Sequence, residues 1–351
     1  MAKRVLMCGN EALAEAAIRA GCRFYAGYPI TPQNEIPAYM SKHMPEAGGV
    51  FIQSESEISA VNMVFGASLT GTRAMTSSSS PGISLKQEGI SYLAACEIPA
   101  VIVNIMRGGP GLGGIGPSQS DYFQATKGGG HGDYHSIVVA PASCQEMVDL
   151  TTLSFDLADK YRTPVMILGD GILGQMMEPV EFSQGAGRTH SAKKDWILDG
   201  CKGREPRIIK SLFLSDGALE QFNLKLQEKY KEIKDKEQRC EVLYGDDSEI
   251  MLVAYGTPSR IARSVVESLR KKGKKIGMAR PLTLWPFPEK AFKELSKKVK
   301  SFLVVEMSAG QMVEDVKLAI DCARPVHFYG RAGGEIPGEE EIIKEIGRIN
   351  G

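Results

Sequence analysis

The chain has 351 residues, of which 43% are hydrophobic, and it carries 42 basic and 42 acidic side chains. This length exceeds one typical domain and predicts two, with enough apolar residues to bury a sizeable core. The balanced charge excludes a global field that would attract nucleic acid or an acidic membrane surface. No run approaches the roughly 20 apolar residues that a membrane-spanning helix requires.

The start of the chain also argues against an export signal. Two basic residues precede an apolar stretch of only a few residues, which is too short for the hydrophobic part of a signal peptide. The seven cysteines are scattered and form no CxxC pair, so the sequence predicts neither a zinc knuckle nor a ferredoxin-type iron–sulfur cluster on this chain. Free, mostly buried thiols in a reducing cytoplasm are the expected arrangement.

Short β-rich runs alternate with helical stretches through the first half of the chain. The predicted strands are Val5–Cys8, Phe24–Tyr28, Val50–Gln53, Arg73–Thr76, Ala100–Ile105 and Val165–Leu168. The predicted helices are Glu11–Ala20, Gln33–Lys42, Ser56–Leu69, Ile83–Ala95 and Cys144–Lys160. This alternation, with strands that are almost continuously apolar, predicts an α/β fold whose parallel sheet is covered by helices on both faces.

The pattern changes near residue 182. Residues 183–207 are polar without periodicity, and Gly217–Arg239 is a charged helical stretch that favours a solvated arm or linker helix. A second alternation follows, with predicted strands Ile250–Ala254, Ile276–Arg280 and Ser301–Val305 and predicted helices Ser259–Lys272 and Glu289–Val299. We therefore expect a first α/β domain over 1–181, a connector over 182–245 and a second α/β domain over 246–351.

Polar residues collect at the carboxyl ends of four predicted strands, where open α/β sheets bind ligands. The four loops are GYPITPQNE (27–35), QSESE (53–57), TSSSSPG (76–82) and MRGGPGLGGIG (106–116). A carboxylate, a hydroxyl-rich turn and an arginine on adjacent loops suit a small anionic substrate that is held beside a larger cofactor.

Three residues in these loops stand out as candidates. Glu57 opens a predicted helix, where it either complements the helix dipole or serves chemistry beside the other polar loops. Arg107 follows a buried strand, where a guanidinium is costly unless it meets an anion, either a substrate carboxylate or a structural acid. Thr31 lies between two prolines in a stiff turn that presents its hydroxyl rigidly, although an ordinary turn explains the same residues.

Three shorter patterns point to other enzymes, and each is incomplete. Gly111–Gly116 matches the dinucleotide fingerprint of NAD-dependent dehydrogenases, but it follows the fifth strand and runs into Pro117. The Ser77–Ser80 run could serve a serine hydrolase, yet it has no nucleophile elbow and no obvious His/Asp partner. Gly169–Gly171 begins like the magnesium motif of thiamine enzymes, but residues 190–202 contain no asparagine to complete it.

Longer blocks of sequence carry a resemblance to a known family. The blocks are 9–32, 55–68, 76–92, 98–114 and 119–134 in the first domain, and 280–288 and 304–316 in the second. They cover the chain almost end to end, most weakly over 183–240, and blocks of this length and order are very specific. On these blocks the chain resembles the alpha subunit of the 2-oxoacid:ferredoxin oxidoreductases.

The resemblance implies that the first domain is the pyrimidine-binding domain of a thiamine diphosphate enzyme and that the second is like the C-terminal domain of transketolase. It implies that Glu57 contacts N1′ of the aminopyrimidine as a catalytic acid/base, and that Thr31 and Arg107 hold the carboxylate of a 2-oxoacid. It also implies contacts with the cofactor for Tyr28, Pro29, Ser80 and Gly82. No metal ligand is expected on this chain.

The family resemblance also implies partners that supply the missing parts. A beta subunit would bind the diphosphate and magnesium and carry an iron–sulfur cluster. A ferredoxin-like delta subunit would carry further clusters, and a gamma subunit would cover the catalytic core. Ferredoxin and coenzyme A would be the remaining partners.

The substrate is narrowed by three of the blocks. Residues 27–37, 77–92 and 107–134 look most like the branched-chain type, which acts on 3-methyl-2-oxobutanoate, and the 2-oxoglutarate type is the closest alternative. A non-catalytic scaffold subunit is a more remote alternative, because Glu57, Thr31 and Arg107 are all present.

Three lesser candidates complete the sequence reading. His131 and Asp133 belong to a glycine-rich loop that could cover the site, although loop histidines are more often ordinary surface residues. Gln311 is expected near a subunit interface on resemblance alone.

Overall fold

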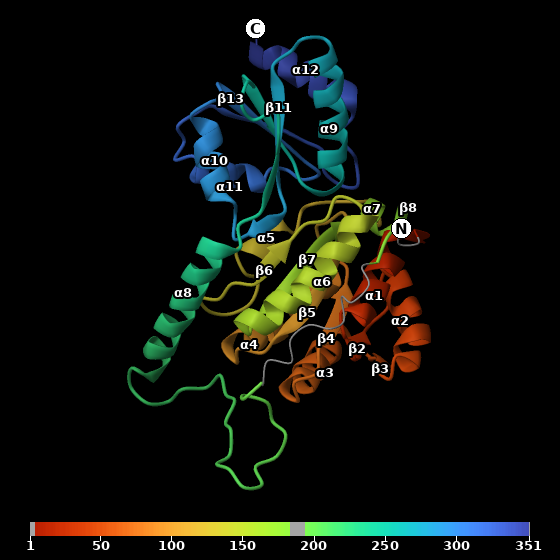
Figure 1. Ribbon diagram of the computed structural model, residues 1–351, viewed down its shortest axis with the longest axis vertical. Coiled ribbons are helices and arrows are strands. Elements are labelled where there is room, and N and C mark those ends of the chain that lie inside the picture. The colour runs from red at the N-terminus through yellow and green to blue at the C-terminus, as the bar shows by residue number, and fades with distance from the viewer. Residues whose placement is uncertain (1–3, 183–193, 351) are drawn as a thin grey trace.

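The computed structural model describes residues 4–182 and 194–350, which form two α/β units joined by a long helix (Figure 1). The first unit contains β1 (Val5–Cys8), α1 (Gly9–Arg19), β2 (Phe24–Gly27), α2 (Glu35–Glu46), β3 (Val50–Gln53), α3 (Glu57–Leu69), β4 (Ala74–Ser78), α4 (Ser80–Ala95), β5 (Ala100–Met106), α5 (Tyr122–Thr126), β6 (Ile137–Val139), α6 (Cys144–Tyr161), β7 (Pro164–Asp170), α7 (Gly171–Gln175) and β8 (Met177–Val180). After the joining helix α8 (Ala218–Lys236) come β9 (Cys240–Leu243), β10 (Ile250–Val253), α9 (Gly256–Lys271), β11 (Ile276–Pro281), β12 (Thr283–Trp285), α10 (Glu289–Ser296), β13 (Ser301–Glu306), α11 (Met312–Ala319), β14 (Val326–Gly330) and α12 (Glu339–Asn350).

The first unit is built on a seven-stranded sheet with the order β12-β6-β7-β5-β4-β2-β3. Strands β6, β7, β5, β4, β2 and β3 run parallel, and the central β5 and β7 are buried along their whole length. Helices α1, α2 and α6 pack together on one face, and α3 and α4 pack together on the other (Figure 1). The predicted α/β fold is confirmed, and the continuous apolar character of the strands follows from burial on both faces.

The second unit has a five-stranded sheet with the order β14-β13-β10-β11-β9, in which only β9 runs antiparallel to its neighbour. Helices α9 and α12 cover one face, and α10 and α11 cover the other (Figure 1). The face under α10 and α11 shares one continuous apolar core with the first unit. None of the described helices is both long and apolar enough to cross a bilayer.

Several strands differ from the sequence-based expectation: β6, β8, β9, β12 and β14 were not predicted, and β1 has an unexpected partner. β1 does not enter the parallel sheet but pairs antiparallel with β8 in a separate two-stranded sheet. A four-residue apolar run gives no information about its partner, so this pairing could not be read from the sequence. β12 was not predicted, and it leaves the second unit to pair antiparallel with the short strand β6 at the edge of the first sheet.

The helix α8 forms where the sequence predicted it, but it is not a freely solvated arm. Three of its apolar side chains are buried against the first unit, namely Leu226, Tyr230 and Ile233. On the same helix, Lys225 and Lys229 form ion pairs with Glu97 of the first unit. One apolar stripe within a mostly charged helix is enough to dock it. The strand β9, which lies within the predicted connector, joins the second sheet.

Candidate functional site

The carboxyl ends of the parallel strands place the predicted polar loops at one edge of the first sheet. Glu57 is the first residue of α3, Ser80 is the first residue of α4, and Arg107 directly follows β5. These three side chains are buried, with exposed fractions of 6–8%. Buried polar side chains at a sheet edge need partners, so the contacts of each one indicate its role.

Glu57 and Gly82 meet, although they come from different loops. Ser56 caps α3 by accepting a hydrogen bond from the backbone N–H of Ser59 at 3.2 Å, which fixes Glu57 in the first helical turn. A Cβ placed on Gly82 would lie 2.6 Å from Glu57 Oε1 and would overlap Ser78 Oγ. Only glycine therefore allows α4 to approach the Glu57 carboxylate this closely. Ser78 Oγ is itself buried without a hydrogen-bond partner.

Ser80 belongs to a network that ties the start of α4 to the end of β5. Its Oγ donates to Asp121 Oδ2 at 2.6 Å and accepts from the backbone N–H of Arg107 at 3.0 Å. Asn104 donates to the same Asp121 oxygen at 2.9 Å and accepts from the Ser80 backbone N–H at 3.1 Å. Burial raises the pKa of Asp121, and the hydrogen bonds from Ser80 and Asn104 oppose that rise. The network holds the hydroxyl of Ser80 and the backbone of Arg107 in place.

Arg107 and Thr31 are also brought together. The guanidinium donates through Nη1 to the Thr31 carbonyl and through Nη2 to the Leu112 carbonyl, each at 3.0 Å. Its Nε is buried without a partner. The sequence left open whether Arg107 pairs with a structural acid. In the structure both of its acceptors are backbone carbonyls, so these contacts do not neutralise its positive charge. An arginine of this kind is ready to accept an anion.

Tyr28 and Pro29 lie on the same loop as Thr31 and are exposed, Tyr28 by 38% of its surface. Both side chains are therefore open to solvent. His131 and Asp133 do not join this cluster. They line a separate cavity of about 300 Å³ that is shared with the connector side chains Phe213, Leu219 and Phe222, among others.

A buried lysine lies next to the serine-rich loop, and the sequence reading missed it. Lys86 of α4 has no exposed surface, and its Nζ donates to Thr76 Oγ1 at 2.5 Å and to the Ser77 carbonyl at 3.0 Å. Burial lowers its pKa to about 7, and the negative charge of Glu57 acts in the opposite direction. A lysine at a helical position normally predicts a solvated surface, so only the packing of α4 on β4 reveals this one.

Asp170, from the partial magnesium motif, has a structural role in this chain. It caps α7 by accepting from the backbone N–H groups of Ile172 and Leu173, and it accepts from the hydroxyl of Thr257 in the second unit at 2.8 Å. In the described residues, no group of three or more His, Cys, Asp or Glu side chains could hold a metal ion.

Gln311 joins the two units of this chain. Its Oε1 accepts from the backbone N–H of Phe123, and its Nε2 donates to the Ser120 carbonyl, both at 2.7 Å. Glu306 fixes the start of α11, which directly follows Gln311, by accepting hydrogen bonds from backbone N–H groups that include that of Met312. The second unit therefore clamps residues on both sides of Asp121, and through Asp121 it supports Ser80 of the site.

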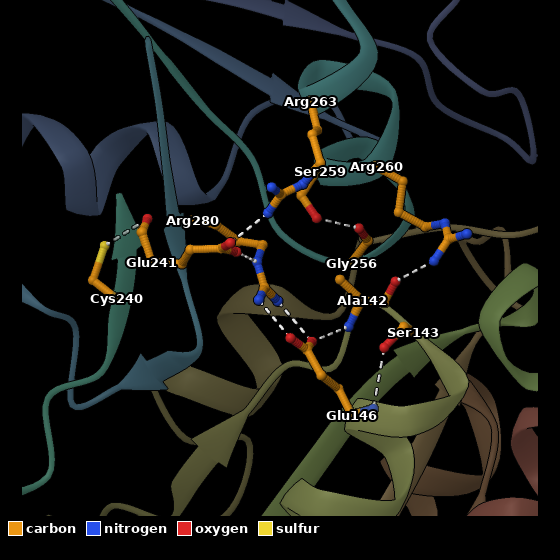
Figure 2. Close-up of polar contacts among 10 residues, drawn as sticks. All are labelled: Ala142, Ser143, Glu146, Cys240, Glu241, Gly256, Ser259, Arg260, Arg263 and Arg280. Carbon is orange, nitrogen blue, oxygen red and sulfur yellow. Dashed lines mark hydrogen bonds and ion pairs between the residues drawn. The ribbon is translucent and has the colours of Figure 1, made fainter. Parts of the chain in front are cut away.

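A second junction between the units is an ion network around Arg280 (Figure 2). Its guanidinium grips Glu146 of α6 with two hydrogen bonds of 2.8 and 2.6 Å and Glu241 of β9 with a third of 2.8 Å. Arg260 and Arg263 complete the wall of a cavity of about 350 Å³. None of the predicted site residues lines this cavity, and its arginines are engaged with protein acceptors, so the network is a structural joint.

Two family models match the chain. Residues 15–242 match the model described as "Pyruvate flavodoxin/ferredoxin oxidoreductase, thiamine diP-bdg", and residues 248–342 match "Pyruvate:ferredoxin oxidoreductase core domain II". Together with the fold, these matches define a thiamine diphosphate-binding subunit of an oxidoreductase. The chain belongs to the 2-oxoacid:ferredoxin oxidoreductase family, as an alpha subunit. The family, the fold class and the enzyme class predicted from the sequence are thereby confirmed.

Individual relatives are consistent with this assignment. The chain is 50% identical over 343 residues to "Ketoisovalerate oxidoreductase subunit VorB" of Methanothermobacter marburgensis, covering 98% of this chain and 97% of the relative. It is 40% identical over 329 residues to "2-oxoglutarate synthase subunit KorA" of Archaeoglobus fulgidus, covering 93% and 94% of the two chains.

Solved structures show the same architecture. The 2-oxoglutarate:ferredoxin oxidoreductase from Magnetococcus marinus, solved with 2-oxoglutarate, coenzyme A and succinyl-CoA bound, matches with a TM-score of 0.88 and 25% identity. The match covers 98% of this chain but 65% of that chain. An inactive split-gene transketolase tetramer matches with a TM-score of 0.62 and 12% identity, a likeness of fold alone.

Proposed function

We propose that this chain is the alpha subunit of a coenzyme A-dependent 3-methyl-2-oxobutanoate:ferredoxin oxidoreductase and supplies the pyrimidine-binding half of a thiamine diphosphate site. The reaction would convert the 2-oxoacid, coenzyme A and oxidised ferredoxin to isobutanoyl-CoA, CO2 and reduced ferredoxin. The branched-chain substrate is supported by the 50% identity to a ketoisovalerate oxidoreductase subunit, against 40% to a 2-oxoglutarate synthase subunit.

The observation that carries the proposal is the contact between Glu57 and Gly82. A flat aminopyrimidine requires a smooth wall beside a carboxylate, and the missing side chain of Gly82 provides that wall. Ser78 Oγ, which is buried without a partner at the same point, adds a hydroxyl that a bound polar ring could use. The residues present therefore fit the cofactor.

Glu57 is proposed to work as the acid/base of the site. Buried at the first turn of α3, its carboxylate would exchange a proton with N1′ of the aminopyrimidine. When bound, thiamine diphosphate supplies the nucleophilic carbon that adds to the 2-oxo group and holds the electron pair left by CO2. A positioned acid/base contributes a factor of about 10²–10⁴ to such reactions.

Arg107 and Thr31 are proposed to hold the carboxylate of the 2-oxoacid. The free Nε of Arg107 would donate to the anion, and the hydroxyl of Thr31, whose backbone carbonyl bonds to the same guanidinium, would add a second donor. We propose cofactor contacts for the exposed Tyr28 and Pro29 and for Ser80 and Gly82 at the start of α4.

The remaining parts of the enzyme are proposed to lie on partner chains. A beta subunit would bind the diphosphate and magnesium and carry an iron–sulfur cluster, a delta subunit would carry further clusters, and a gamma subunit would complete the complex. We also propose a reducing, cytoplasmic location, which the seven free cysteines support. We propose 1–181 as the pyrimidine-binding domain, 182–245 as the connector, whose last strand β9 pairs in the second sheet, and 246–351 as the transketolase C-terminal-like domain.

The substrate is tested by purifying the complex from native cells or a co-expressed operon and measuring reduction of a viologen dye. Reduction that requires coenzyme A, thiamine diphosphate and magnesium, with a higher kcat/KM for 3-methyl-2-oxobutanoate than for 2-oxoglutarate, is the expected result. A preference for 2-oxoglutarate would instead assign the chain to the 2-oxoglutarate type, the alternative that the similarity to the relative from Archaeoglobus fulgidus supports.

The role of Glu57 is tested in the same complex. Glu57→Gln should lower the turnover by a factor of about 10²–10⁴. The matched control is Glu55→Gln, since Glu55 is an exposed glutamate two residues earlier and should leave turnover unchanged. Full activity in the Glu57→Gln complex would overturn the proposed function of this site.

A further inference from the structure

Behind Glu57 lies a layer of polar side chains with no exposed surface. The layer consists of Tyr25, Gln33, Thr76, Ser77, Ser78 and Lys86, each with an exposed fraction of 0%. Its members are largely hydrogen-bonded to each other: Tyr25 Oη and Ser77 Oγ lie 2.6 Å apart, and Ser77 Oγ donates to Gln33. A lysine without any exposed surface is rare because burying an ammonium ion is costly.

Lys86 lies one helical turn beyond Gly82 on the same face of α4. Gly82 meets Glu57 and Ser78, and Lys86 meets Thr76 and Ser77, the preceding residues of β4. The ammonium group is thus held directly beneath the contact that defines the site. Two of its three N–H groups bond to the protein at Thr76 Oγ1 and the Ser77 carbonyl, so its charge is solvated only in part.

Among the residues around Lys86, Glu57 is the one with the opposite charge. Glu57, from α3, is the carboxylate whose negative charge favours the protonated lysine. Tyr25, from β2, has its pKa raised by burial and remains a neutral hydroxyl, and the groups of β4 and Gln33 carry no charge. Among the described residues, the hydrogen bonds of the Lys86 ammonium group go to Thr76 and Ser77 and not to Glu57, so the two charges act on each other through the buried layer.

We propose that Lys86 is a positioning residue that acts on Glu57 from behind: its positive charge favours the ionised carboxylate and so extends the range of pH in which Glu57 can accept a proton from the cofactor. The inference rests on the proposed role of Glu57. Removal of the positive charge leaves an ionised Glu57 less stabilised, so a higher pH is needed to keep it ionised.

The test is the pH dependence of kcat/KM for the complete complex with the 2-oxoacid as substrate. Lys86→Met keeps the length and removes the charge, and Lys86→Gln removes the charge but keeps a donor for Thr76. Both should move the acid limb of the profile to higher pH by about 0.5–1 unit, the lower end expected for separated buried charges. Activity at the acid limb would then fall by a factor of about 3–10 and recover towards the wild-type value at alkaline pH.

A matched control is Lys229→Met, which removes a mostly buried lysine of α8 that pairs with Glu97 instead of Glu57. It should leave the acid limb in place. A Glu57→Gln, Lys86→Met double variant should show the profile of Glu57→Gln alone, because Lys86 acts through Glu57.

The outcomes separate the two proposals. If Glu57→Gln abolishes activity while both Lys86 variants keep the wild-type acid limb, the role of Lys86 is wrong and that of Glu57 stands. If Glu57→Gln leaves activity unchanged, the proposed function fails. A uniform loss of activity at every pH in both Lys86 variants would show a structural role and would also overturn the inference.

Discussion

The joint around Arg280 allows a quantitative prediction for stability. Arg280 is 5% exposed and makes three charge-assisted hydrogen bonds, two to Glu146 of the first unit and one to Glu241 of the second (Figure 2). These bonds raise its pKa although burial acts in the opposite direction. The substitution Arg280→Met keeps most of the volume but leaves two carboxylates facing each other across the joint.

The expected loss in the free energy of unfolding depends on the solvent exposure and the hydrogen bonds that Glu146 and Glu241 keep in the variant. Removing one partner of a buried ion pair costs about 3–5 kcal/mol when the remaining charge is uncompensated. Here the side chains of Glu146 and Glu241 keep 26% and 33% exposure and can rehydrate in part. Glu241 also retains Arg263, and Glu146 retains the backbone N–H of Ala142. We therefore expect a loss of about 2–4 kcal/mol in the free energy of unfolding.

The assay is urea denaturation followed by tryptophan fluorescence. Trp285 lies in β12 at the joint, 7% exposed and stacked on His135, so its emission reports this region. The control is Arg263→Met, which removes a partly exposed partner of Glu241 and should cost less than about 1 kcal/mol. Equal losses in the two variants, or a loss below 1 kcal/mol for Arg280→Met, would refute the view that Arg280 holds the units together.

Three further predictions follow from the site and its surroundings. Gly82→Ala should reduce turnover of the complex by at least about tenfold, because the added methyl group overlaps Ser78 and displaces Glu57; normal turnover would contradict the close approach. The pKa of Lys86 is about 7 in the folded protein, against 10.5 for the free group, so between these pH values the unfolded chain binds a proton that the folded protein has lost. The free energy of unfolding should therefore rise with pH in this range. Denaturation of Lys86→Met at several pH values should show no such rise from residue 86. Burial raises the pKa of Glu97, but Lys229 and Lys225 of α8 together lower it below the ordinary 4.5. The difference in the free energy of unfolding between the wild type and Lys229→Met should therefore persist above about pH 4.5 and shrink as the pH falls further. A difference that does not change with pH would show that packing alone is responsible.

Strong local patterns made much of the first unit predictable. Strand and helix alternation marked β2 to β5 and their helices, and polar residues at strand ends marked Glu57, Ser80 and Arg107. Parallel strands force these ends to one edge, which is why residues far apart in sequence could be grouped correctly. The contacts of Glu57 with Gly82 and of Arg107 with Thr31 follow from that rule.

Other parts of the site could not be read from the sequence. Asp121 lies beyond a glycine-rich loop and meets Ser80 in a segment that the second unit clamps. Lys86 looks like a surface lysine until α4 is packed on β4. β12 and its partner β6 are each three residues long and lie far apart in the chain. Strands this short show no periodicity from which their pairing could be predicted. Each of these depends on tertiary contacts that local patterns do not encode.

The pairing of β12 with β6 determines how this polypeptide can be divided. A fragment that stops before the second sheet would lose β12 and leave the backbone groups of β6 open along the edge of the first sheet. It would also lose Trp285, which packs against both His135 and Tyr230. An unprotected edge is a template for pairing with other chains, so such a fragment would aggregate. Although its two large sheets belong to different units, the chain cannot be cut between them without exposing the edge of the first sheet.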